Sequence, residues 1–164
     1  MVAVTMLILS APRAQSAGST DASRMFMTKA MQGNLAEIQI GELAQQKGTN
    51  ERVKRFGEKL VTDHGANLEK AESVAQSIGV SPPTAPNATQ KAAYDRLNKL
   101  SGSEFDRKFA QHMVQDHKKD IKEFRHQSKK SGPIADFARQ TAPKLQQHLR
   151  IAESLARSVA PSAR

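Results

Sequence analysis

One pattern occurs twice in this chain, at residues 56–68 (FGEKLVTDHGANL) and at residues 109–121 (FAQHMVQDHKKDI). Both copies place Phe, then Leu or Met, Val, an Asp–His pair and finally Leu or Ile at matching positions. The apolar members recur with the period of an α-helix, and His64 and His117 each fall on the apolar stripe of their own segment. Burying an imidazole costs free energy unless its polar atoms find partners. The chain is therefore predicted to fold into helices that enclose a polar site.

The composition supports a single helical domain. A chain of 164 residues is long enough for one substantial core and too short for two domains to be expected. With six Phe, one Tyr and no Trp, the core must consist mainly of aliphatic side chains, alanine and methionine. The chain has no cysteine, which excludes disulfides and thiolate ligands. A metal ion would therefore be bound by His, Asp and Glu.

Four segments carry apolar or small residues at helical spacing, namely residues 26–44, 53–78, 105–124 and 137–155. The first two segments are separated by Gly48 and its neighbours, and the last two by a Gly–Pro pair. Links this short join antiparallel neighbours. The sequence therefore predicts two helical hairpins.

The helix ends carry residues that favour capping. Thr49 or Asn50 is predicted to cap the second long helix. Ser103, with Asp106 three residues later, predicts an acidic capping box at the start of the third. Pro143 lies inside the last segment and removes a backbone donor there, which predicts a kink or a separate helical piece.

The link between the two hairpins, residues 79–102, is rich in proline and too long for a simple turn. It also predicts a short amphipathic helix around Ala93 and Leu97. A link of this length can cross the bundle, so that the second and third long helices run parallel. The predicted fold is all-α, a four-helix bundle with one long crossover carrying a short extra helix, over residues 18–160, with a frayed tail at 161–164.

The N-terminal residues 1–17 are predicted to be a signal peptide or N-terminal leader. Val2 to Leu9 form an apolar run too short to span a bilayer, and Ala14 and Ser16 provide a small-x-small cleavage site. No Lys or Arg precedes the run, which is consistent with a start inside a longer signal. The alternative is a disordered or interfacial N-terminal tail. The leader predicts a periplasmic or secreted protein, with association with the envelope as a further expectation.

The formal net charge of +9 has two interpretations. Lys and Arg residues of the third long helix mostly alternate with its core positions, as on a solvated face, and this interpretation is favoured. The other is a surface that binds anionic envelope components, with peripheral membrane association at most. No aromatic residue interleaves the charges to stack on bases, so nucleic acid is not expected as a partner.

One polar residue from each long helix is expected at a similar depth in the bundle, although the first two helices differ by about one turn. Three imidazoles and a carboxylate facing inward suit a divalent transition metal such as zinc, copper or iron. The predicted ligands are Glu37, His64, His117 and His148, with Asp63 and Asp116 as hydrogen-bond partners of histidines on neighbouring helices. The alternative is a buried hydrogen-bond network of the same residues without a metal.

Four motifs carry a resemblance to a known family: residues 33–38 (GNLAEI), residues 61–64 (VTDH), the Phe105–Asp106 pair and residues 143–148 (PKLQQH). Over about residues 21–157 the chain resembles exported bacterial ferritin-like proteins, a domain of unknown function whose members are commonly labelled membrane proteins. The resemblance implies a ferritin-like four-helix bundle and brings no established activity. Di-iron proteins of that fold supply four carboxylates and two Glu-x-x-His motifs. One carboxylate and three histidines replace them here, so iron storage and oxygen activation are not expected.

The function predicted from the sequence is that of an exported helical-bundle protein with a metal-binding interior site. The alternative is a non-catalytic envelope or stress-associated interaction protein whose buried histidines are structural. An enzyme is less favoured, because the chain has no cysteine and no serine in a Gly-x-Ser-x-Gly turn.

Overall fold

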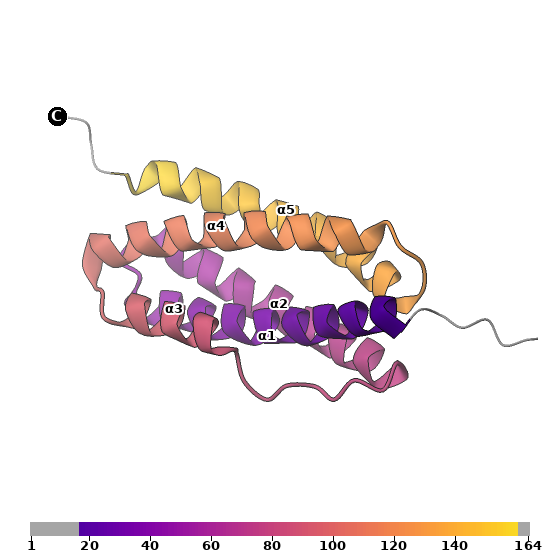
Figure 1. The fold of residues 1–164 in the computed structure, drawn as a ribbon. Helices are drawn as coiled ribbons and strands as arrows, with labels where there is room; N and C mark the ends of the chain where they lie inside the picture. Colours follow the sequence, from indigo (N-terminus) through magenta and orange to yellow (C-terminus); the bar gives the residue numbers. More distant parts are fainter. Residues whose placement is uncertain (1–16, 161–164) are drawn as a thin grey trace, which may run out of the picture.

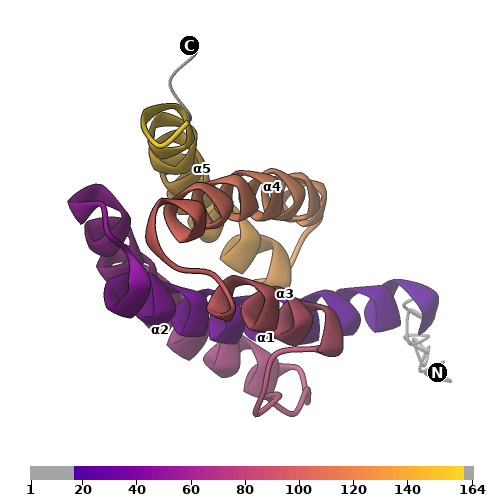
Figure 2. The same cartoon turned by 90° about the vertical axis from the view of Figure 1, so that its left-hand side faces the viewer.

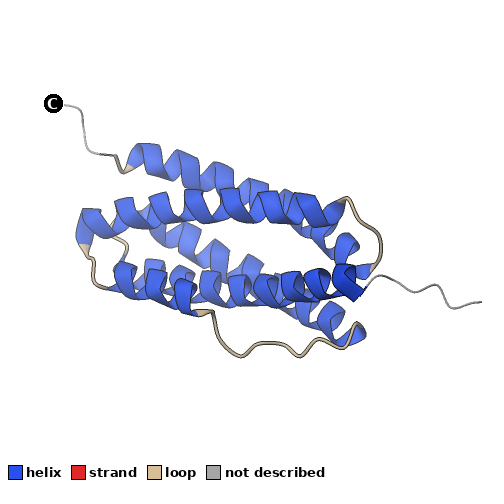
Figure 3. Cartoon of the chain, in the orientation of Figure 1, coloured by secondary structure: helices blue, strands red, loops and turns tan. Residues whose placement is uncertain are grey.

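The structure, a computed structural model, describes residues 17–160. These residues form five helices and no strand (Figure 3): α1 Ala17–Lys47, α2 Glu51–Ser77, α3 Ala88–Asn98, α4 Gly102–Ser128 and α5 Pro133–Ser158. The predicted all-α class is therefore confirmed for the described part of the chain. The predicted leader lies outside the described residues except for Ala17, which begins α1, and the predicted tail at 161–164 lies outside them entirely.

The four long helices lie side by side as two antiparallel hairpins, α1 with α2 and α4 with α5 (Figure 1). The segment that joins the hairpins runs back along the bundle and carries α3, so that α2 and α4 point in the same direction. The short α3 packs against α1 and α4 (Figure 2). Within residues 17–160, no helix has both the length and the apolar character that a membrane span requires.

The first hairpin is held at very close range by two glycines. A Cβ built on Gly57 would lie 2.5 Å from the carbonyl oxygen of Gly41, and a Cβ on Gly41 would lie 2.7 Å from that of Gly57. Only glycine at both positions allows the two backbones to touch in this way. One heptad further along each helix, the same antiparallel register brings Asn34 of α1 against His64 of α2. The glycine contact therefore sets the position of one histidine of the site.

The start of α4 is tied to the start of α2 by a buried carboxylate. Asp106 accepts hydrogen bonds from the backbone N–H of Thr49 at 3.1 Å and of Asn50 at 2.9 Å. Asn50 in turn caps α2 by accepting from the N–H of Arg52, as predicted. The predicted capping box at Ser103 is wrong, because α4 begins at Gly102 and the Asp106 carboxylate is used by the other hairpin. The carboxylate links the two hairpins instead of closing its own helix.

A polar layer divides the core into two apolar clusters. One cluster includes Leu60 and Met113, and the other includes Ala71 and Ile121. Between them lie buried polar side chains, among them Asn34, Glu37, Thr141 and the histidines His64, His117 and His148. The helix α5 continues through Pro143, so the separate helical piece predicted there does not occur. The bundle is thus apolar at both ends and polar at mid-height.

Candidate metal centre

Three histidines from three helices meet in the polar layer. His64 on α2, His117 on α4 and His148 on α5 are 4%, 1% and 0% exposed. One ring nitrogen from each lies within 4.8 Å of the others. The parallel course of α2 and α4 places the two copies of the repeated motif at the same height. The short α4–α5 link then brings His148 level with His117.

Two of the histidines have a ring nitrogen fixed by an oxygen acceptor. His117 donates from Nδ1 to the backbone carbonyl of Met113 at 2.9 Å. His148 donates from Nε2 to the Asp63 carboxylate at 2.7 Å. A carbonyl and an ionised carboxylate can only accept, so in each neutral ring the proton is on that nitrogen.

The third histidine is fixed by a chain of amides. His64 Nδ1 lies 2.9 Å from Asn34 Oδ1, which also accepts from Asn67 Nδ2 at 3.1 Å. Asn67 Oδ1 accepts from the Thr141 hydroxyl at 2.9 Å. This chain orients the Asn34 oxygen toward His64, so the neutral ring carries its proton on Nδ1.

The remaining ring nitrogens therefore face one another as lone pairs. His117 Nε2 and His148 Nδ1 are 3.3 Å apart, and each neutral ring has already used its single N–H elsewhere. His64 Nε2 is buried and has no hydrogen-bond partner. Such a convergence of acceptors is unfavourable unless a cation lies among them.

The electrostatics keep these rings neutral. Burial lowers the pKa of His117 to about 4, with His148 as a further cause. Burial also lowers the pKa of His64 well below its usual value, and the neighbouring histidines add to that effect. For His148, burial lowers the pKa although the Asp63 hydrogen bond opposes it. Burial alone would raise the pKa of Asp63, but hydrogen bonds from His148, Lys59 and Lys144 lower it to about 2.

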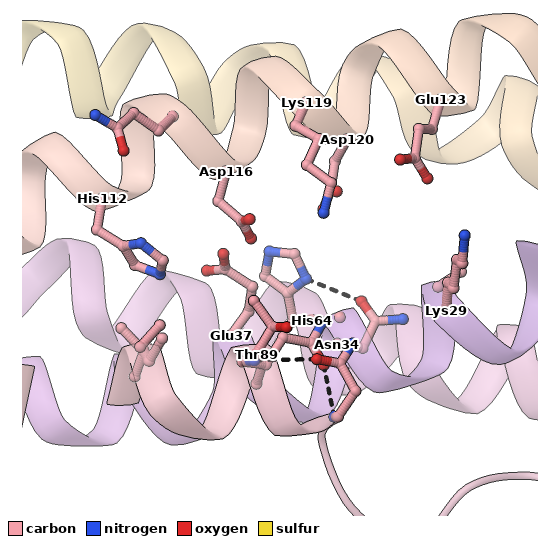
Figure 4. A pocket seen from close by; sticks show the side chains of 18 of the residues that line it. Lys29, Asn34, Glu37, His64, Thr89, His112, Asp116, Lys119, Asp120 and Glu123 are labelled. Atoms are coloured by element: carbon pink, nitrogen blue, oxygen red, sulfur yellow. Dashed lines mark hydrogen bonds between the residues drawn. The ribbon is translucent and has the colours of Figure 1, made fainter. Parts of the chain in front are cut away.

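The predicted ligand Glu37 does not belong to the group of three histidines. It lies in an adjacent cavity of about 620 Å³, which His64 also lines. Figure 4 shows the carboxylates of Glu37 and Asp116 pointing toward one another there. Burial raises the pKa of Glu37 well above its ordinary value, and the nearby Asp116 and Asp120 raise it further. Burial and Asp116 likewise raise the pKa of Asp120 to about 7.

The two predicted partner carboxylates thus have different surroundings. Asp63 accepts a hydrogen bond from a histidine on a neighbouring helix, whereas Asp116 faces Glu37. Sequence reasoning missed Asn34 as the partner of His64. His112 lies half-buried in the cavity wall. The signal for Asn34 was the difference of about one turn between the depths of Glu37 and His64, counted along their helices from Gly48. Because of that difference, the residue that lies level with His64 is one turn before Glu37 on α1.

The fold and the site define the class of this protein as an all-helical bundle with three buried, converging histidines. Over residues 9–155 the chain matches the family described as "Domain of unknown function (DUF4142)", and it belongs to that family. Its fold is similar to that in the crystal structure of a DUF305 fragment from Deinococcus radiodurans, with a TM-score of 0.74 at 14% sequence identity. That similarity covers 89% of this chain and 99% of the other. No curated protein matches the chain significantly.

Proposed function

We propose that this protein binds one divalent transition metal ion on His64, His117 and His148. The observation that carries the proposal is the convergence of three ring nitrogens whose opposite nitrogens all donate to oxygen acceptors. Ligating histidines in proteins make such outer hydrogen bonds, which fix the tautomer and orient the ring. The lowered pKa of each ring also favours the neutral form that a metal needs.

The distances suit an ion after a small adjustment. Zinc–nitrogen bonds of about 2.0–2.1 Å in tetrahedral geometry separate ligand nitrogens by about 3.4 Å. His117 Nε2 and His148 Nδ1 are already 3.3 Å apart. The group as a whole lies within 4.8 Å, so His64 has to approach by at most about 1.4 Å. Zinc, copper and iron all accept imidazole nitrogen, and the donor set does not by itself select one of them.

Only His64 of the three lines the large cavity. Three protein ligands leave one position of a tetrahedral ion for water or a small ligand. The cavity is the side from which such a ligand would reach the ion. We include no reaction in the proposal, because the donor set is shared by binding and catalytic sites.

The wider proposal is a ferritin-like metal-binding protein of the bacterial envelope. The parallel course of α2 and α4, with the crossover between them, supports the ferritin-like arrangement. The apolar N-terminal run supports export, and the basic composition suits contact with anionic envelope components. The competing proposal is an interaction protein in which one extra proton is shared by His117 and His148. The low pKa of His117 disfavours that proton at neutral pH.

The test is a metal titration of untagged protein with zinc, copper(II) and iron(II), read by calorimetry and by metal analysis after desalting. We expect one ion per chain and a rise in melting temperature that a chelator reverses. An ion at 100-fold its dissociation constant stabilises the fold by about 2.7 kcal/mol. His148→Gln should abolish this binding. The matched control is His126→Gln, which alters an exposed histidine at the end of α4.

Absence of stoichiometric metal, together with a melting curve that neither metal nor chelator changes, would reject the metal site. The shared-proton network would then be the better account of the three histidines.

A further inference from the structure

The cavity beside the histidines contains a carboxylate without a partner. Glu37 is 1% exposed, and its Oε2 atom is buried with no hydrogen-bond partner. It projects from α1 into the cavity of about 620 Å³ between α1, α4 and the start of α3. An unpartnered buried carboxylate oxygen is costly, because its desolvation is not offset. A cation in the cavity or a proton shared with Asp116 is needed to satisfy it.

Two further carboxylates face the same space from the opposite helix. Asp116 and Asp120 are one turn apart on α4, so they lie on the same face of that helix. Figure 4 shows Asp116 directed at Glu37 across the cavity. Three acidic groups, one of them fully buried, therefore share one partly enclosed volume, where like charges repel strongly.

No basic side chain neutralises this group. Among the residues that the structure describes, no Lys, Arg or His nitrogen lies within 4.0 Å of a carboxylate oxygen of Glu37, Asp116 or Asp120. Lys29, Arg96 and Lys119 line the same cavity, but all three side chains are exposed. Asp63, the counterpart of Asp116 in the repeated motif, is instead paired with two lysines and a histidine. The negative charge of the cavity is therefore concentrated on its interior carboxylates, while the basic groups lie at its exposed edge, and the cavity has room for a hydrated ion.

We propose that this cavity binds a hydrated divalent cation of the hard class, magnesium, calcium or manganese(II), between Glu37 and Asp116. Hard cations prefer oxygen ligands, and magnesium in particular keeps several waters while one or two carboxylates hold it. Asp120 contributes through a bound water from the next turn. This site is separate from the histidine centre, because its donors are oxygens. It satisfies Glu37 Oε2, whereas the histidine centre satisfies His64 Nε2. It therefore does not depend on the function proposed above.

Manganese(II) is the probe, because free and bound ions are distinguished by electron paramagnetic resonance. Titration of untagged protein at neutral pH should show one bound ion per chain, displaced by excess magnesium. Glu37→Gln keeps the shape of the side chain and should weaken this binding about 10-fold or more. Glu69→Gln, an exposed change on α2, is the matched control and should leave it unaltered. Asp120→Asn provides a second variant if Glu37→Gln does not fold.

His148→Gln separates the two sites. We expect it to retain manganese while losing zinc, and Glu37→Gln to do the reverse. Zinc binding that fails while manganese binding holds would reject only the histidine centre. No manganese binding to the wild-type protein at millimolar concentration, or binding that survives Glu37→Gln and Asp120→Asn, would overturn the carboxylate site. The carboxylates of Glu37 and Asp116 would then be satisfied by a shared proton.

Discussion

Replacing Gly57 with alanine tests the contact that places His64. An alanine gains about 1 kcal/mol over glycine in a helix interior, so propensity alone predicts stabilisation. The structure predicts the opposite, because the new methyl carbon would lie 2.5 Å from the Gly41 carbonyl oxygen and 2.9 Å from Cβ of Ala44. Both obstacles lie on α1 next to its backbone, so they can move only if the helix moves.

The magnitude follows from the two opposing contributions. Restoring an ordinary contact requires the helices to separate by nearly 1 Å, and overpacking of this kind costs typically about 1–3 kcal/mol. Here the rigid backbone obstacle places the cost at or above the upper end of that range. After subtracting the propensity gain, we expect Gly57→Ala to lower the free energy of unfolding by about 2 kcal/mol.

Gly65→Ala is the matched control, because it lies on the same helix and its Cβ would meet nothing within 4 Å. It should raise the free energy of unfolding by up to about 1 kcal/mol. Urea denaturation followed by circular dichroism measures both variants, and their difference of about 3 kcal/mol is well above experimental error. Equal stability of the two variants would refute the close glycine contact and with it the proposed basis for the Asn34–His64 register.

Four further predictions follow from the site and the N-terminus. Asp63→Asn removes the charged acceptor of His148 and should weaken zinc binding about 10- to 100-fold, as measured with a competing chelator; unchanged affinity would show that the carboxylate does not orient the ring. In the presence of chelator, the pKa of His117 is about 4 in the folded protein and about 6.5 in the unfolded chain. The contribution of neutral His117 to stability is therefore present above pH 6.5 and is lost as the pH falls toward 4, by up to about 3 kcal/mol. The pKa of Asp120 is raised to about 7, so this carboxyl group contributes stability that increases as the pH falls over the same range. Asp120→Asn should therefore make the free energy of unfolding fall more steeply with acidification, as measured by denaturation at pH 5, 6 and 7. The same slope in the variant and the wild-type protein would contradict these pKa directions. Export predicts a mature N-terminus between Ala14 and Gly18 on protein from the periplasmic or membrane-associated fraction, and an intact Met1 on cytosolic protein would contradict it.

The helices and their links were predictable because local rules determine them. Apolar residues at helical spacing mark four stripes, and the lengths of the links restrict which helices can be antiparallel. The partner of Asp106 was not predictable in this way. A carboxylate near a helix start looks the same in sequence whether it caps its own helix or, as here, accepts from Thr49 and Asn50 of the other hairpin.

The meeting of the three histidines could be inferred from the sequence because each lies on an apolar stripe and their depths follow from counting residues from a turn. The position of Glu37 could not. Counting along α1 leaves an uncertainty of about one turn, and one turn decides whether Glu37 or Asn34 reaches His64. Only the close glycine contact between α1 and α2 resolves the register, and nothing in the sequence shows that those two glycines touch.

The different surroundings of the two motif aspartates follow from the approximate symmetry of the two hairpins. Exchanging α2 with α4 and α1 with α5 maps Asp63 onto Asp116 and His148 onto Glu37, and the sequences that begin at Glu37 and His148 are themselves similar (EIQIGE and HLRIAE). The residue that faces Asp63 from the neighbouring helix is His148, which forms a hydrogen bond with it. The residue that faces Asp116 is Glu37, so in this half of the layer two carboxylates lie together. The same motif therefore produces a nitrogen-rich centre in one half of the layer and an oxygen-rich cavity in the other, with donors that suit different classes of cation.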